Sequence, residues 1–136
     1  MKKKLCVMIC FIFALCGAVL MTVPAQAKVK KNSEDVKNIY KLIKNIEDDE
    51  IWNLDSSCYT WNKKTGRLTE IDFSEHSVKG KLSFNNFSQL ESISIEKNKI
   101  TNVNFSNLNK LKYLDCDNNK IVSMDLSNLR KLEYLH

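Results

Sequence analysis

The feature that most constrains this chain is a 21-residue repeat in its C-terminal half. Copies begin at Leu90, Leu111 and Leu132, at intervals of 21 residues, and a more divergent copy begins at Leu68, 22 residues before Leu90. Positions 1, 4, 6, 9 and 11 hold Leu90, Ile93, Ile95, Asn98 and Ile100 in one copy, and Leu111, Leu114, Cys116, Asn119 and Ile121 in the next. Units of this length bury their apolar faces against their neighbours, so the pattern predicts a solenoid.

Within each copy, the apolar residues at positions 4 and 6 alternate with polar ones, which predicts a short strand with one buried face. Asn98 and Asn119 follow where the chain must turn away from the strand. A buried amide at that point can satisfy backbone groups that no sheet partner reaches, each bond contributing about 1 kcal/mol net. We expect stacked copies to form a parallel sheet on one side and irregular or 3₁₀ turns on the other.

The pattern L-x-x-L-x-L-x-x-N-x-L resembles the leucine-rich repeat over residues 68–136, about three copies and the start of a fourth. The resemblance implies an α/β-type solenoid with a short parallel sheet on its concave face and a 3₁₀ or irregular convex side. Internalin-like bacterial surface proteins, whose 21-residue repeats this chain resembles, also use cysteine at position 6. That implies a structural, buried Cys116. His76 occupies the asparagine position of the first copy, and we expect a structural imidazole making the same turn bonds.

Residues 28–67 are expected to form an N-terminal helical and aromatic cap, since the first strand of a solenoid has an uncovered side. Asn32 to Asp35 supply helix-capping groups, an apolar stripe follows at helical spacing, and the acidic run at 47–50 is expected to end the helix. Cys58 and Trp61 before Gly66 and Arg67 resemble the cap of plant-type extracellular leucine-rich repeats. Those caps pair two cysteines and this segment has one, so an intermolecular bond through Cys58 stays open.

The N-terminus predicts export. A basic start, an apolar run from Leu5 to Met21 and the small residues of Ala25-Gln26-Ala27 are typical of a secretory signal cleaved after Ala27. The alternative is an uncleaved membrane anchor. Cleavage would remove three lysines, leave 18 Lys and Arg against 16 Asp and Glu, and make the domain secreted or cell-surface, with no membrane span. The lysine-rich signal and the repeat type suggest a Gram-positive source.

The sequence contains few indications of a catalytic or metal-binding site. No catalytic triad spacing, glycine-rich phosphate loop or metal-ligand spacing is present, so we expect no enzyme activity, no cofactor and no metal. Asp115-x-Asp117-x-Asn119 imitates a calcium loop but has Lys120 in place of the required glycine and Leu126 in place of the final glutamate. No basic patch with interleaved aromatics appears, which argues against nucleic acid.

The positive functional prediction is a binding face. Positions 3 and 5 of the copies should point outward on the concave side, which is the usual binding surface of solenoids. The candidates at these positions are Glu70, Asp72, Ser92, Ser94, Tyr113, Asp115 and Tyr134, with His136 beside them. Tyr113 and Tyr134 should stack one repeat apart as contact anchors. The expected partner is a protein or a glycan.

A second hypothesis is that the chain is a truncated repeat fragment without independent activity. The sequence stops at His136 inside an expected strand, which would leave the last apolar residues uncovered and favour self-association. An enzyme would require a catalytic domain beyond His136.

Overall fold

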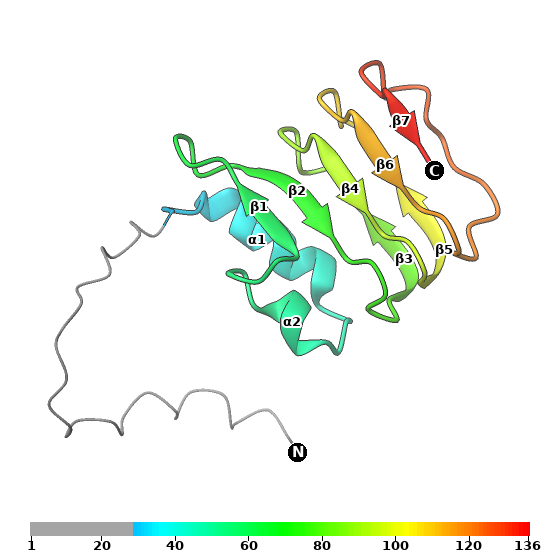
Figure 1. Ribbon diagram of the computed structural model, residues 1–136, viewed down its shortest axis with the longest axis horizontal. Coiled ribbons are helices and arrows are strands. Elements are labelled where there is room, and N and C mark those ends of the chain that lie inside the picture. The colour runs from blue at the N-terminus through cyan, green and yellow to red at the C-terminus, as the bar shows by residue number, and fades with distance from the viewer. Residues whose placement is uncertain (1–28) are drawn as a thin grey trace, which may run out of the picture.

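The structure is a computed structural model that describes residues 29–136, so the expected signal segment, residues 1–27, lies outside the described residues. The described chain forms a parallel-strand solenoid of about three turns (Figure 1). Strands β2 (Leu68–Asp72), β4 (Ser92–Ser94), β6 (Tyr113–Asp115) and β7 (Tyr134–Leu135) stack in parallel in one sheet. The repeat solenoid predicted from the 21-residue spacing is confirmed.

The strand register follows the repeat position by position. Ile71 is paired with Ile93, Ile93 with Leu114, and Leu114 with Leu135, all at position 4. The first three of these side chains are buried in the core. Because side chains alternate across a strand, positions 3 and 5 point to the other face of the sheet.

The asparagines act as predicted at the turns. Asn98 Oδ1 accepts from the Val78 amide at 2.8 Å, and its Nδ2 donates to the carbonyls of Phe73, Ile95 and Glu96. Asn119 repeats this arrangement one turn later, accepting from the Ile100 amide at 3.0 Å and donating to carbonyls of its own turn and of the one before. Each asparagine therefore links its turn to the preceding one.

The side opposite the parallel sheet differs from the prediction. Strands β3 (Lys79–Ser83) and β5 (Lys99–Asn104) pair in parallel and form a second, two-stranded sheet, and residues 29–136 contain no 3₁₀ helix. The physical reason is a second alternation of apolar residues: Leu82 pairs with Val103, and both are buried. Phe84 and Phe105 then stack with ring centroids 6.1 Å apart.

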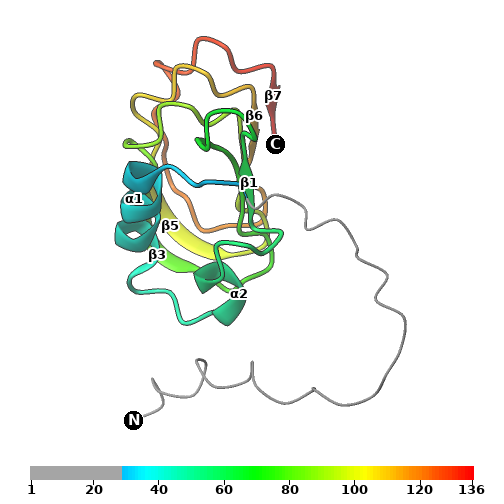
Figure 2. The same cartoon turned by 90° about the vertical axis from the view of Figure 1, so that its left-hand side faces the viewer.

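The N-terminal segment contains helix α1 (Ser33–Ile43), helix α2 (Asp49–Trp52) and strand β1 (Tyr59–Trp61). Asn32 caps α1 as expected, accepting from the amides of Glu34 and Asp35. Strand β1 pairs antiparallel with β2, so the first edge of the sheet is covered by hydrogen bonds. Figure 2 shows α1 and β1 on opposite sides of the first turn, with α2 below them.

Two expectations for this segment were incomplete. The predicted stripe comprises Val36, Ile39, Tyr40, Ile43 and Ile46, of which only Ile39 and Ile43 are buried. Tyr40 is exposed and stacks on Trp52 with ring centroids 5.9 Å apart. The acidic run at 47–50 follows the first helix and also begins the second. Asp48 caps α2 by accepting from the amides of Glu50 and Ile51, so its negative charge stands at a helix N-terminus, where it is favourable.

Candidate binding site

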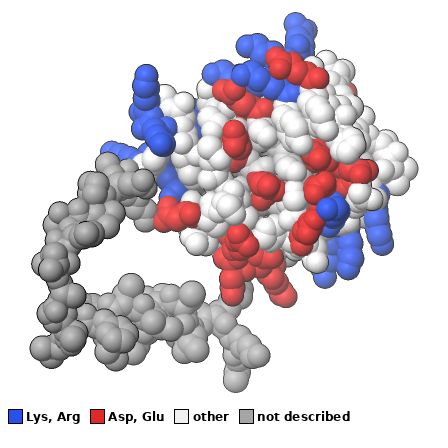
Figure 3. Space-filling model, in the orientation of Figure 1, with Lys and Arg blue, Asp and Glu red and all other residues white. Residues whose placement is uncertain are grey.

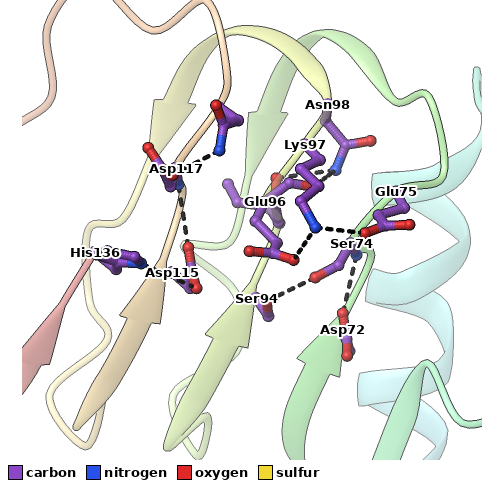
Figure 4. Close-up of polar contacts among 12 residues, drawn as sticks. Asp72, Ser74, Glu75, Ser94, Glu96, Lys97, Asn98, Asp115, Asp117 and His136 are labelled. Atoms are coloured by element: carbon purple, nitrogen blue, oxygen red, sulfur yellow. Dashed lines mark hydrogen bonds and ion pairs between the residues drawn. The ribbon is translucent and has the colours of Figure 1, made fainter.

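The outward positions of the parallel sheet form one continuous surface, which we call the sheet face. It consists of the residues at positions 3, 5 and 7 of each copy. Register aligns Glu70, Ser92, Tyr113 and Tyr134 across neighbouring strands, and it aligns Asp72, Ser94 and Asp115 beside them. Figure 4 shows Ser74, Glu96 and Asp117, at position 7, beside these rows, at the ends of the strands; the prediction from the sequence did not include them.

A depression of about 270 Å³ lies in the sheet face. Five of the seven predicted binding residues line it, namely Glu70, Asp72, Ser92, Ser94 and Tyr113. The rest of its polar lining comes from β1 and the loop before it, through Ser57, Cys58 and Thr60. Sequence analysis missed these three because the antiparallel pairing of β1 with β2 lies outside the repeat pattern. The alternation Cys58-Tyr59-Thr60-Trp61 was the local signal that could have indicated a strand.

The two tyrosines stack as predicted. The rings of Tyr113 and Tyr134 are nearly parallel, with an interplanar angle of 2° and centroids 4.6 Å apart. Tyr134 is 45 % exposed and Tyr113 is half-buried. Burial, followed by the nearby carboxylate of Asp115, raises the pKa of Tyr113, and the phenol donates a hydrogen bond to Asp115 Oδ2 at 3.4 Å.

The sheet face is acidic. Its carboxylates are Glu70, Asp72, Glu96, Asp115 and Asp117, and positions 3, 5 and 7 contain no lysine or arginine. Figure 3 shows carboxylates distributed over this view, with most of the lysines and arginines around its margin. Lys97, at position 8, partly offsets the charge through contacts with Glu75 at 2.7 Å and Glu96 at 3.4 Å.

Short polar contacts hold the ends of the strands in place (Figure 4). Asp72 accepts from the Ser74 amide at 2.9 Å, and the hydroxyls of Ser74 and Ser94 are 2.7 Å apart. Asp115 makes the equivalent contact with the Asp117 amide at 3.1 Å, and it also lies 3.7 Å from His136 Nδ1. The result is a pre-formed polar surface.

Asp115 differs from the exposed contact residue that the sequence predicted. It is only 6 % exposed, since it lies among Tyr113, Asp117 and His136. Its carboxylate therefore contributes negative potential to the sheet face more than direct contact area.

The structural roles predicted for Cys116, at position 6 of its copy, and for His76, at position 9 of the first copy, have different outcomes. Cys116 is buried with its thiol donating to the His136 carbonyl, and burial raises its pKa, in agreement with a core role. His76 was expected to repeat the backbone bonds of Asn98. Its ring nitrogens instead contact Asp48 Oδ2 at 2.9 Å and Cys58 Sγ at 3.7 Å. Both Cys58 and Cys116 are free thiols.

Within residues 29–136, no cluster of three or more His, Cys, Asp or Glu side chains is arranged to hold a metal ion. No helix in this part of the chain combines the length and apolar character needed to cross a membrane. Comparisons with protein-family models, curated proteins and solved structures find no match to the chain.

Proposed function

We propose that this chain is an exported leucine-rich repeat module that binds a protein or glycan partner through the sheet face. The observation that carries the proposal is the depression beside the stacked tyrosines, in which five outward residues from three strands line one surface. Ligand sites are concave and combine apolar contact area with a few convergent polar groups. On the sheet face the depression supplies the convergent polar groups, and the rings of Tyr113 and Tyr134 supply the apolar contact area.

The tyrosine pair supports an anchoring role. Two stacked rings supply a rigid contact surface at low entropic cost, and tyrosine is enriched among residues that dominate binding energy. The exposed edge of Tyr134 can pack against a side chain of a protein or against the apolar face of a sugar ring. The phenol of Tyr113 donates to Asp115 Oδ2 at 3.4 Å, so its oxygen can accept a hydrogen bond from a ligand.

The charge of the sheet face supports a partner with cationic groups. Glu70 and Asp72 are exposed within the depression, and Asp115, two strands away on the same face, adds negative potential. Complementary charge raises the rate of association and selects against anionic partners. Among protein ligands, segments bearing lysine or arginine fit this surface best.

The leucine-rich repeat assignment rests on the repeat pattern together with the turn bonds of Asn98 and Asn119. The N-terminal segment is proposed to act as the cap of the solenoid, because β1 pairs with the edge of β2 that would otherwise be open. Secretion rests on the signal-like N-terminus.

The test is a binding screen of the purified protein against glycan arrays and tiled peptides that are basic, neutral or acidic. The variant Tyr113→Ala/Tyr134→Ala is compared with Lys81→Ala/Asn102→Ala, a double change on the exposed side of the β3–β5 sheet. We expect to find ligands whose affinity falls on the order of 100-fold in the tyrosine variant, as for the loss of an interface anchor. The control variant should bind the same ligands with unchanged affinity. Ligands bound equally by both variants would place the binding surface elsewhere.

A further inference from the structure

Cys58, His76 and Asp48 form a linked arrangement at the N-terminal edge of the sheet face. His76 Nδ1 lies 2.9 Å from Asp48 Oδ2, and His76 Nε2 lies 3.7 Å from Cys58 Sγ. The three residues come from separate segments: the N-cap of α2, the loop after β2 and the residue preceding β1. We propose that Cys58 is a thiol activated by His76, and that it takes a small disulfide as its covalent partner.

The contacts define which nitrogen acts as the base. A carboxylate only accepts hydrogen bonds, so with neutral His76 the proton lies on Nδ1, facing Asp48. Nε2 then has a free lone pair directed at the Cys58 thiol. Asp48 is itself held, because its Oδ1 accepts from the amides of Glu50 and Ile51. A nucleophile, a base and a group that orients the base are the parts of an activated thiol.

The repeat shows that a histidine is not needed for the structural task at this position. Asn98 and Asn119, at the equivalent place, reach back to backbone groups of the preceding turn. His76 also reaches back, but the preceding elements are α2 and β1, and it contacts a carboxylate and a thiol there. An asparagine at position 76 would supply an amide but no base.

Cys58 borders the depression in the sheet face. Thr60 lies opposite Glu70, and the Cys58 carbonyl accepts from the Asp72 amide at 2.9 Å. Tyr59 enters the core and Thr60 points to the opposite side; Thr60 and the buried Cys58 both line the depression. Cys58 is 2 % exposed and the His76 side chain 18 %, so only a slender reagent can approach.

The surroundings determine which reagent is favoured. Burial raises the pKa of the Cys58 thiol. A hydrogen bond with Ser56 opposes this, the carboxylates of Glu50, Asp72 and Asp48 act in the same direction as burial, and the net result keeps the resting form a neutral thiol. Reaction therefore requires a base at the moment of attack. The same three carboxylates repel anionic reagents and attract cationic ones.

In the reaction, the Cys58 proton passes to His76 Nε2 as Sγ attacks one sulfur of the disulfide. The Cys58–reagent S–S bond forms and the reagent's own S–S bond breaks. The leaving thiolate then takes the proton from the imidazolium and departs as a thiol, so no further oxidant is needed.

The test uses the full chain with its thiols reduced, and cystamine as the cationic disulfide. Intact mass and peptide mapping follow modification of Cys58, with Cys116 as the internal control because it is also buried but has a backbone carbonyl at its thiol. We expect Cys58 to react first, and His76→Asn to slow it on the order of 100-fold, the effect of losing a general base. Dithiodiglycolate, the anionic counterpart, should react more slowly than cystamine.

Asp48→Asn provides a second variant that keeps the α2 cap, since asparagine also caps helices, while removing the charge beside His76. It should slow the modification of Cys58 and leave the rate at Cys116 unchanged. If His76→Asn does not fold, Asp48→Asn alone tests the proposal. Equal rates for Cys58 and Cys116, or a Cys58 rate that is unchanged or raised in the folded variants, would overturn the proposal.

Discussion

Asp35 and Arg67 form a bidentate ion pair that joins helix α1 to the start of strand β2. The guanidinium donates from Nε at 2.7 Å and from Nη2 at 3.0 Å, and the same carboxylate accepts from the Leu68 amide at 2.9 Å. Asp35 is 1 % exposed. The pair therefore anchors the N-terminal segment to the first strand of the solenoid.

We predict that Asp35→Ala lowers the free energy of unfolding by about 2–4 kcal/mol, because it leaves a buried amide and a partly buried guanidinium without their acceptor. Urea unfolding measures the change. Lys97→Ala is the control, since it removes an ion pair whose two side chains are largely exposed, and it should alter stability little. Comparable effects from the two variants would show that the anchor contributes no more than a surface pair.

The two asparagines should differ in importance. Asn98→Ala removes four hydrogen bonds and leaves their buried backbone partners unsatisfied. We predict that this lowers the free energy of unfolding by about 3 kcal/mol. Asn119 makes the same kinds of bonds but is less buried, so water can replace some of them and the cost should be smaller. Urea unfolding of the two alanine variants tests the order, and a larger loss for Asn119→Ala would contradict it.

Acid should weaken the fold partly through Asp48. Burial acts to raise the pKa of this carboxyl, but its hydrogen bonds with His76, Ile51 and Glu50 outweigh burial and hold the pKa below its ordinary value of 3.8. A lowered pKa in the folded state contributes stability that is present above 3.8 and is lost as the pH falls through the folded value.

Unfolding free energies measured from neutral pH downward through 3.8 should therefore fall less steeply for Asp48→Asn than for the unchanged chain. The pKa values of Glu75 and Glu91 are also lowered, by Lys97 and Lys112, and both the Asp48→Asn variant and the unchanged chain keep these pairs. The difference between the two curves thus isolates Asp48. Parallel curves would mean that the His76 contact does not stabilise the folded state.

The last turn of the described chain exposes apolar side chains. Val122 is 93 % exposed and Leu135 50 %, and Met124, Leu126 and Leu135 line a depression of about 350 Å³ at that end. For a polypeptide of residues 29–136 we predict concentration-dependent self-association there, because covering such side chains contributes about 25 cal/mol per Å². Sedimentation should detect dimers that Leu135→Lys weakens. A monomer at every concentration would refute this.

The repeat allowed most of the solenoid to be predicted, while the contacts outside it could not be. Strand register and the bonds of Asn98 follow from positions that recur every 21 residues, so local pattern determines them. Pairing of β1 with β2 and the contact of His76 with Asp48 join segments with no shared period. The burial of Asp115 depends in part on His136, which follows the adjacent strand β7 and which a one-strand pattern does not reveal.

Gly66 and Gly80 provide a matched pair for testing how closely the N-terminal segment is held. Both have positive φ, at 67° and 84°, so alanine at either position costs about 1–2 kcal/mol of backbone strain. A Cβ on Gly66 would also lie 2.0 Å from the Lys30 carbonyl oxygen, whereas a Cβ on Gly80 would meet nothing within 4 Å.

The Asn32 amide donates to the Gly66 carbonyl at 2.7 Å, so the Lys30 backbone cannot move away without breaking this link to α1. We therefore predict that Gly66→Ala destabilises the protein more than Gly80→Ala does, and that hydrogen exchange in α1 increases in the first variant alone. Equal losses in both would mean that only backbone strain matters, and that residues 30–32 do not hold α1 against the first strand.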